Sequence, residues 1–431
     1  MYSKSPMLLF IALFLGLPNI AATQVSELLF LELSSALLSP VGAGARAAGQ
    51  GFAFIGVADD ATAASHNPGG LTQLERPEMS VVGSYFLSSE QTDGASLDFI
   101  SVVFPPFKLL NRKIVASLQV QRTFQLRDSL DLMTLPETNL KDARLIYERD
   151  GDLFSISPAI AIQITRSFSV GVTFNIWPDL FDNGWTTDIT LEAGDQRVKS
   201  TSDVSYEAFN ITAGFLWKIT SRFTLGGVFS NPYTATLTRH SESERTGEPK
   251  RSIRENLDLD LPLSYGLGLS ARVSDLLTLS FDILWVHWSD FRLQDVPSSF
   301  FIPELPTDSG GTRDVVVVPE FRMASRGDTT SIRIGMEYLW LPPNNLIIPL
   351  RAGVFYDPEP AFDGIHDFFG FGLGAGIAIG RYLLDVAYTF RTGTRTQLVV
   401  ADEDRADEDR VNQITTTVYE HNFIFSMIVH F

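Results

Sequence analysis

The sequence predicts an all-β protein: a 14-stranded antiparallel transmembrane β-barrel with an N-terminal plug, or hatch, in its lumen. Three observations predict it. Apolar and polar residues alternate along repeated segments, short and long connections alternate between those segments, and the chain ends on an aromatic strand. No apolar run of about 18 residues occurs beyond the N-terminus, which argues against a helical membrane protein.

Residues 1–22 have the pattern of a secretory signal peptide. Lys4 supplies a positive charge, and residues 7–17 form an apolar core that is too short to span a bilayer. Pro18 ends this core, and the small residues up to Ala22 provide a cleavage site. We therefore expect the mature chain to begin near residue 23.

Residues 23–77 are rich in glycine and irregular, with a short amphipathic helix expected over Ser26 to Ser39. Glycine lets backbones approach closely and turn sharply, so this region is predicted to be the plug. From Glu78 the pattern changes to strands that continue to the C-terminus, which predicts a barrel domain over residues 78–431.

The strands of this barrel domain show the alternation expected when one face meets lipid and the other meets the lumen. In one of them, Tyr382, Leu384 and Val386 oppose Arg381 and Asp385. Fourteen candidate strands lie near residues 78–89, 94–106, 112–126, 150–164, 168–192, 201–219, 222–239, 255–273, 276–292, 329–341, 347–358, 367–379, 381–397 and 413–431.

The connections between the strands alternate in length. The short ones are residues 105–111, 165–167, 220–221, 274–275, 341–345 and 380. Most of the intervening ones are long and charged: residues 127–149, 240–254, 293–328 and 399–412. Outer-membrane barrels have short periplasmic turns and long extracellular loops. A soluble β-sandwich would explain the strands but not this asymmetry.

The C-terminal residues alternate Phe423, Phe425, Met427, Val429 and Phe431 with mixed residues, as expected of a closing strand that pairs with the strand near residue 80. The terminal phenylalanine resembles the signal read by the barrel-assembly machinery. Together with the signal peptide, it predicts the outer membrane of a Gram-negative bacterium. Membrane lipid and the assembly machinery are the expected partners, and a closed barrel without a free edge is expected to be a monomer.

The composition limits the possible ligands. The formal charge is −18 and the pI about 4.7, so no basic surface for nucleic acid is implied. Cysteine is absent, which excludes disulfides and thiolate metal sites, and the six histidines show no metal-ligand spacing. The acidic repeat at residues 401–410 is interpreted as a solvated loop rather than a calcium site. No cofactor is expected.

Two motifs suggest chemistry but are better explained otherwise. The glycine-rich residues 42–51 follow no clear strand and lack the Gly-Lys-Ser/Thr of a phosphate loop. His287 and Ser289 lie two residues apart on one predicted strand, as a base and nucleophile of an outer-membrane lipase would. No orienting acid is expected on that face, so an interfacial aromatic belt containing Trp285 and Trp288 is preferred. The chain is therefore not expected to be an enzyme.

The glycine-rich segment, followed by Asn67-Pro68-Gly69-Gly70-Leu71, resembles the plug of FadL-type outer-membrane transporters of long-chain fatty acids and other hydrophobic compounds. The family has an alanine where this chain has Gly69. Further segments that are similar to the family are residues 261–266, 279–289, 333–338, 350–357, 372–376 and 384–390. The family barrel also has fourteen strands.

This resemblance implies passive uptake of fatty acids or aromatic hydrocarbons. Ligand would be captured among extracellular loops, pass to an interior pocket and leave through a gap in the barrel wall. The plug would gate the lumen through Asn67, Pro68, Gly69 and Gly70.

The ligand-contacting residues are not determined by this resemblance. Arg46 is a candidate partner for a carboxylate, and Phe300 and Phe301 are candidates for capture in a loop. A related group of plug-bearing barrels serves protein secretion or surface attachment and shares the same N-terminal motifs. That role remains the alternative.

Overall fold

The structure of the chain is a computed structural model. It describes residues 42–89, 93–133, 143–180, 182–193, 196–247, 249–294, 327–343, 346–361, 364–400 and 411–431. The predicted signal peptide, the helix expected over Ser26 to Ser39, Phe300, Phe301 and the acidic repeat at 401–410 lie outside these residues.

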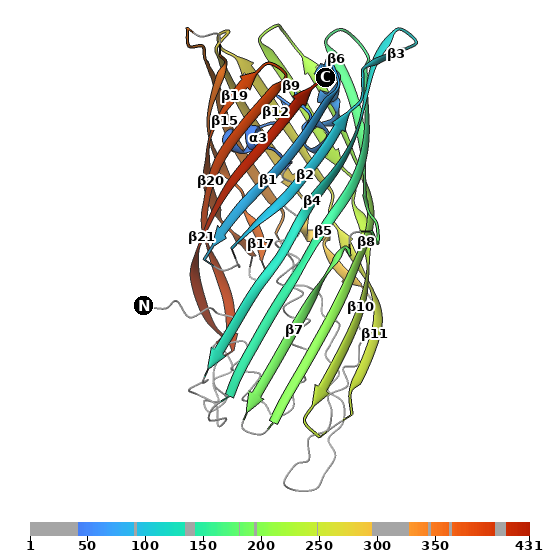
Figure 1. Ribbon diagram of the computed structural model, residues 1–431, viewed down its shortest axis with the longest axis vertical. Coiled ribbons are helices and arrows are strands. Elements are labelled where there is room, and N and C mark those ends of the chain that lie inside the picture. Colours follow the sequence, from blue (N-terminus) through green and yellow to red (C-terminus); the bar gives the residue numbers. More distant parts are fainter. Residues whose placement is uncertain are drawn as a thin grey trace.

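The described chain forms a closed barrel of fourteen antiparallel strands, as predicted (Figure 1). Three short helices precede it: α3 (Ala45–Gly49), α4 (Ala63–His66) and the 3-10 helix η1 (Pro68–Gln73). Ten barrel strands are single elements: β1 (Glu78–Ser88), β2 (Gly94–Val103), β4 (Arg112–Met133), β5 (Ala143–Gln163), β8 (Gln196–Lys218), β15 (Thr329–Trp340), β16 (Ile348–Tyr356), β19 (Phe368–Ile379), β20 (Tyr382–Val400) and β21 (Val411–His430).

The other four barrel strands are each interrupted once along their length. Their paired elements are β6 (Phe168–Trp177) with β7 (Gly184–Ala193), β9 (Phe223–Ser230) with β10 (Tyr233–Arg245), β11 (Arg251–Leu261) with β12 (Ser264–Arg272), and β13 (Leu277–Val286) with β14 (Arg292–Gln294). The 3-10 helix η2 (Trp288–Asp290) lies in the last interruption. Short strand β3 (Phe107–Leu109) lies beside β4, and β17 (Glu359–Ala361) pairs with β18 (Gly364–His366) in a small separate sheet.

The ring closes between β1 and β21, which confirms the predicted closing pair. The register runs antiparallel from Glu78 opposite His430 to Ser88 opposite Glu420. The backbone N–H of Phe431 donates to the carbonyl of Pro77 at 3.0 Å, so the ladder continues to the last residue. Among the described helices, none is long and apolar enough to cross a membrane.

The outward face is apolar, as the alternation predicts. Large apolar residues at every second position, including Leu384 and Phe425, are 42% and 55% exposed in the isolated chain. The residues between them are polar and buried, for example Asp385 at 5% and Ser426 at 7%. The outward side therefore suits lipid, and the polar residues face the interior.

The predicted bounds of three long loops, residues 127–149, 240–254 and 399–412, are wrong because strands extend into them, whereas β15 begins at Thr329 as predicted. β4 and β5 remain paired as far as Met133 opposite Arg144, although residues 127–149 were expected to be loop. The same extension brings Val400 of β20 opposite Val411 of β21. Charged side chains do not end these strands, because they can pair across the ladder, as Arg127 does with Asp150 at 3.2 Å.

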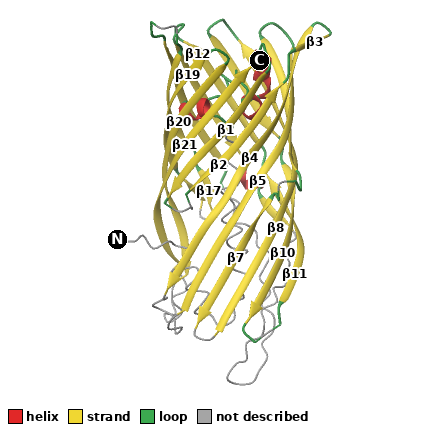
Figure 2. Cartoon of the chain, viewed as in Figure 1, coloured by secondary structure: helices red, strands yellow, loops and turns green. Residues whose placement is uncertain are grey.

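Residues 42–77, here called the inner segment, lie inside the barrel. It lies close to strands all around the ring: β6, β8, β9, β12, β15, β16 and β19 on one side, and β20, β21, β4 and β5 on the other. Only a segment in the lumen can contact strands on so many sides. Its helices lie toward the end of the barrel that carries the C-terminus and the short turns (Figure 2).

Glycine makes this close contact with the wall possible. Gly51, at φ +60°, lies against Gly353 of β16, and Gly69 lies against Gly214 and Phe215 of β8. A methyl group on Gly353 would lie 2.2 Å from the carbonyl carbon of Gln50, which is far too close. The inner segment is thus seated by direct contact between two backbones.

We expect Gly353→Leu to displace the inner segment, because the backbone of Gln50 and Gly51 fills the space of the new side chain. Limited proteolysis with trypsin, read as cleavage after Arg46, should become at least tenfold faster. Gly380→Asn is the matched control, because nothing lies within 4 Å of Gly380 and asparagine tolerates its φ of +61°. Equal cleavage rates in both variants would contradict this account.

Candidate functional site

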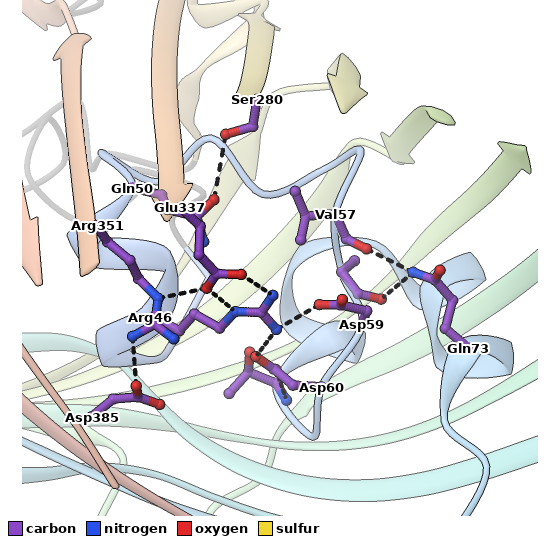
Figure 3. Close-up of polar contacts among 12 residues, drawn as sticks. Arg46, Gln50, Val57, Asp59, Asp60, Gln73, Ser280, Glu337, Arg351 and Asp385 are labelled. Carbon is purple, nitrogen blue, oxygen red and sulfur yellow. Dashed lines mark hydrogen bonds and ion pairs between the residues drawn. The ribbon is translucent and has the colours of Figure 1, made fainter. Parts of the chain in front are cut away.

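A chain of ion pairs joins the inner segment to the wall (Figure 3). The guanidinium of Arg46 donates to both carboxylate oxygens of Glu337 on β15, at 2.9 and 3.1 Å. It also donates to Asp59 at 2.6 Å and lies 3.5 Å from Asp60. Bidentate arginine–carboxylate contacts fix position as well as charge. Glu337 therefore holds the helix α3 against the wall.

The series of ion pairs continues along the inner face of the barrel wall. Arg351 of β16 donates to Glu337 at 2.7 Å and to Asp385 of β20 at 2.5 Å. The side chains of Arg351 and Asp385 are 1% and 0% exposed. Breaking a buried pair leaves an uncompensated charge, which typically costs about 3–5 kcal/mol. The sequence analysis gives these wall residues no role. The signal that could have found them is a charged residue at a strand position opposite the apolar, outward face.

Asn67 fastens the inner segment at a second place. Its side-chain amide donates to the carbonyls of Ile55 at 2.9 Å and of Phe215 in β8 at 2.8 Å. Its side-chain oxygen accepts from the N–H of Gly69, and Pro68 starts the 3-10 helix η1. The carbonyl of Gly69 accepts from the hydroxyl of Ser169 on β6. The structure thus brings Asn67, Pro68 and Gly69 into contact with the wall, whereas Gly70 packs against Ala58 within the inner segment. The role of these four residues in gating remains a prediction.

Asp282 of β13 provides a third attachment. Its Oδ2 accepts from the backbone N–H groups of Phe54 and Ile55, at 2.6 and 2.8 Å. The residue is 1% exposed. A carboxylate that accepts two backbone hydrogen bonds from one turn determines where that turn lies.

A cluster of apolar side chains occupies the interior beyond the inner segment, and we call it the apolar inner cluster. On β4, Val115 packs with the inner segment, whereas Leu126, farther from the short turns, belongs to this cluster. Its members are Leu126, Leu153, Trp177, Trp185, Val204, Tyr206, Ala235, Leu237, Leu257, Leu259, Leu261, Leu284, Val286, Trp288 and Phe291. Such an interior differs from the polar lumen of a water-filled porin.

A cavity of about 200 Å³ lies between the inner segment and this cluster. From the inner segment it is lined by Phe52, Ile55, Ala64, Ser65 and His66. From the wall it is lined by polar residues (Gln119, Gln121, Thr123, Ser155, Asn175, Asn210, Thr212, Ser230, Ser264 and Arg333) and by apolar or aromatic ones (Trp177, Val228, Tyr233, Leu261, Pro262, Leu284, Val286 and Trp288).

The strand interruptions surround this cavity. Trp177 ends β6, Ser230 and Tyr233 flank the second break, and Leu261 with Ser264 flank the third. Proline contributes to these interruptions at Pro178, Pro232 and Pro262, because it cannot donate to the ladder. The wall beside the cavity is therefore the part of the barrel in which continuous pairing is broken.

The remaining predicted site residues have different surroundings. Arg46 directs its donors at the three carboxylates described above. Its contact with the carboxylate of a ligand remains a prediction. His287 and Ser289 do not share a strand, because β13 ends at Val286 and η2 begins at Trp288.

Both residues contact Asp328. The sequence alone does not show that this acid lies beside them. The hydroxyl of Ser289 donates to it at 2.8 Å, and His287 Nδ1 lies 3.3 Å away. A lipase needs the histidine between serine and acid, but here the acid lies between them. The belt assignment of Trp288 is wrong: the side chain is 3% exposed and packs in the apolar inner cluster, because the strand ends at Val286 and Trp288 begins η2.

No protein-family model and no curated protein matches this sequence. Solved structures do match. A FadL homologue from Pseudomonas aeruginosa has a TM-score of 0.62 at 15% identity, covering 90% of this chain and 98% of that one. The CymD monoaromatic hydrocarbon channel has a TM-score of 0.56 at 15% identity, covering 91% and 99%. The Ralstonia pickettii toluene transporter TbuX has 0.52 at 13%, covering 91% and 99%.

The chain has the fold of the FadL-type channels. This fold and the apolar outward face place it in the outer membrane of a Gram-negative bacterium. The similar structures are named as channels and transporters rather than enzymes.

We expect the seating of the inner segment to depend on pH through His66. Burial lowers its pKa from 6.5 to about 4, against the opposing effect of its hydrogen bond to the carbonyl of Ala43. The neutral ring is thus favoured in the seated state. As the pH falls from about 6.5 to about 4, a released segment takes up a proton that the seated one does not. Seating should therefore weaken by up to about 3 kcal/mol across that range.

Hydrogen exchange of residues 42–77 at pH 7 and at pH 4.5 would measure this effect. Protection should fall at the lower pH in the natural chain and change less in His66→Phe, which keeps the ring against Phe54. His240→Phe, at an exposed histidine, is the control and should respond as the natural chain does. Equal loss of protection in His66→Phe would contradict the assignment.

Proposed function

We propose that this protein is an outer-membrane channel for the passive uptake of small hydrophobic molecules. The apolar inner cluster is the observation that carries the proposal. A hydrophobic solute is excluded by the polar surface of the outer membrane rather than by its hydrocarbon core. An apolar surface inside a barrel removes such a solute from water, which gains about 2.5 kcal/mol per 100 Å² of apolar area buried.

The path that we propose has three stages. Solute is captured on the extracellular side, moves along the apolar inner cluster to the cavity, and leaves sideways where strand pairing is interrupted beside that cavity. Lateral exit delivers the solute directly into lipid, so that it never has to enter the water of the periplasm. The interruptions at Pro178, Pro232 and Pro262 support this exit route.

The inner segment is proposed to act as the plug that closes the lumen toward the short-turn end. Its attachments through Glu337, Asp282 and Asn67 support this role, because together they hold it against several strands. The names of the similar structures support the substrate class: one is a monoaromatic hydrocarbon channel and another is a toluene transporter. The size of the cavity favours small solutes over an extended polypeptide, and thus uptake over protein secretion.

Leu259→Gln is expected to lower uptake about tenfold, because Leu259 is fully buried in the apolar inner cluster and a buried amide without partners costs about 1–3 kcal/mol. The measurement is uptake of labelled toluene and oleate by cells that express the chain. Leu110→Gln, at a turn residue that is 89% exposed, is the control and should leave uptake unchanged. If cells that express the natural chain take up no more toluene or oleate than cells without it, the proposal is wrong.

Arg46→Met is expected to open the lumen, because it leaves Glu337 without one of its two arginines and frees α3 from the wall. Single-channel conductance in planar bilayers should rise several-fold. Arg127→Met removes an exposed arginine that pairs with Asp150, and should have no effect. A conductance that is the same in all three proteins would show that the inner segment does not gate.

A further inference from the structure

The cavity lining contains two chemically different sets of side chains, and only one of them suits a hydrocarbon. In the first set, here called the aromatic wall, Trp177 stacks on Tyr233 with ring centroids 5.6 Å apart, and Leu284, Val286 and Trp288 add apolar surface. The second set, here called the polar wall, consists of the neutral amides and hydroxyls of Gln119, Gln121, Asn175, Asn210, Thr212 and Ser230. A pure hydrocarbon would cover these polar groups without pairing them, which costs free energy.

Two lining groups lack a partner within the described part of the chain. Gln119 is 2% exposed, and its Oε1 accepts no hydrogen bond there. Arg333 is 5% exposed, and its Nε donates none. Buried polar groups of proteins are nearly always paired, so an unpaired acceptor and an unpaired donor on one cavity point to a ligand or water that pairs with them.

The polar wall is already ordered. The amide of Asn175 donates to Asn210 at 2.7 Å and to Thr212 at 3.2 Å, and Thr212 and Ser230 share a hydrogen bond of 2.7 Å. Trp177 Nε1 donates to Thr123 at 3.0 Å. These contacts hold the polar side chains in place before any ligand arrives, which lowers the cost of binding.

Charge argues against a carboxylate ligand. Arg333 is the cavity's guanidinium, and Asp357 lies 3.5 Å from it, so its charge is already balanced. His66, which also lines the cavity, is neutral at pH 7 for the reason given above. A carboxylate placed here would lose its hydration without gaining an unbalanced cation.

From these features we infer that the cavity binds a small aromatic molecule with one neutral polar group that both donates and accepts hydrogen bonds, such as an aromatic alcohol. This inference rests on the proposed function and names its substrate class. The ring would lie on the aromatic wall and the hydroxyl on the polar wall. A volume of about 200 Å³ is sufficient, since a cavity of about 150 Å³ can hold benzene.

The test compares benzyl alcohol, toluene and benzoate, which share a ring and differ in the polar group. Binding to the purified full-length protein in detergent micelles is measured by calorimetry, after subtraction of protein-free micelles. Benzyl alcohol should bind more tightly than benzoate. Gln119→Met should weaken benzyl alcohol about tenfold and leave toluene within twofold, because only the alcohol pairs with the amide.

Gln163→Met is the matched control, because Gln163 lies at a short turn outside the cavity. Folding of each variant is checked by heat-dependent migration in gels. If Gln119→Met does not fold, Thr212→Val, which removes a hydroxyl from the polar wall, gives the same comparison. Tightest binding of benzoate, or equal weakening of toluene and benzyl alcohol, would overturn the inference. If toluene uptake still depends on Leu259 in that case, the proposed function stands and only the substrate class is wrong.

Discussion

A chain in hydrocarbon has to satisfy every backbone polar group internally, and the pairing of β1 with β21 is the interaction that meets this requirement here. Without it two strands would present unpaired edges to lipid. Closure also divides the residues into two populations, because each strand must turn one face to lipid and the other to a lumen. The inner segment, the ion pairs and the cavity all depend on that lumen being enclosed.

An enclosed lumen has to be filled, and the chain fills its two parts differently. Near the short turns, wall glycines admit the backbone of the inner segment, and charges such as Glu337, Arg351 and Asp385 pair in the little space that remains. Farther along, large apolar side chains from successive strands pack together on the inner face of the wall. Backbone contact and charge give the first part a defined position. The second part is held mainly by apolar contact, which is less directional and suits its proposed role of accepting a solute.

Local periodicity is enough to predict the strands, but not the interior. The count of fourteen strands, the short turns and the closing strand follow from alternation, because lipid selects the residues on one face. The apolar inner cluster does not follow, since Leu257, Leu259 and Leu261 are inward-facing apolar residues where a polar lumen is expected. Contacts between distant segments, such as Asp328 with His287 or Arg46 with Glu337, have no signature in a single sequence. The sequence underestimates strand length at β4, β5 and β20, because charged residues there suggest loop.

The order of these parts along the lumen has a consequence for selection. On the proposed path, an apolar molecule that moves inward along the apolar inner cluster would meet polar side chains at Asn175 and Gln119, beside the interrupted wall pairing. Without a polar group it would gain nothing by going farther, so the proposed lateral exit into lipid would be its most favourable direction. A molecule with a hydroxyl gains hydrogen bonds at the same place and stays longer. The same polar wall would thus direct hydrocarbons outward and retain those molecules that can pair with it.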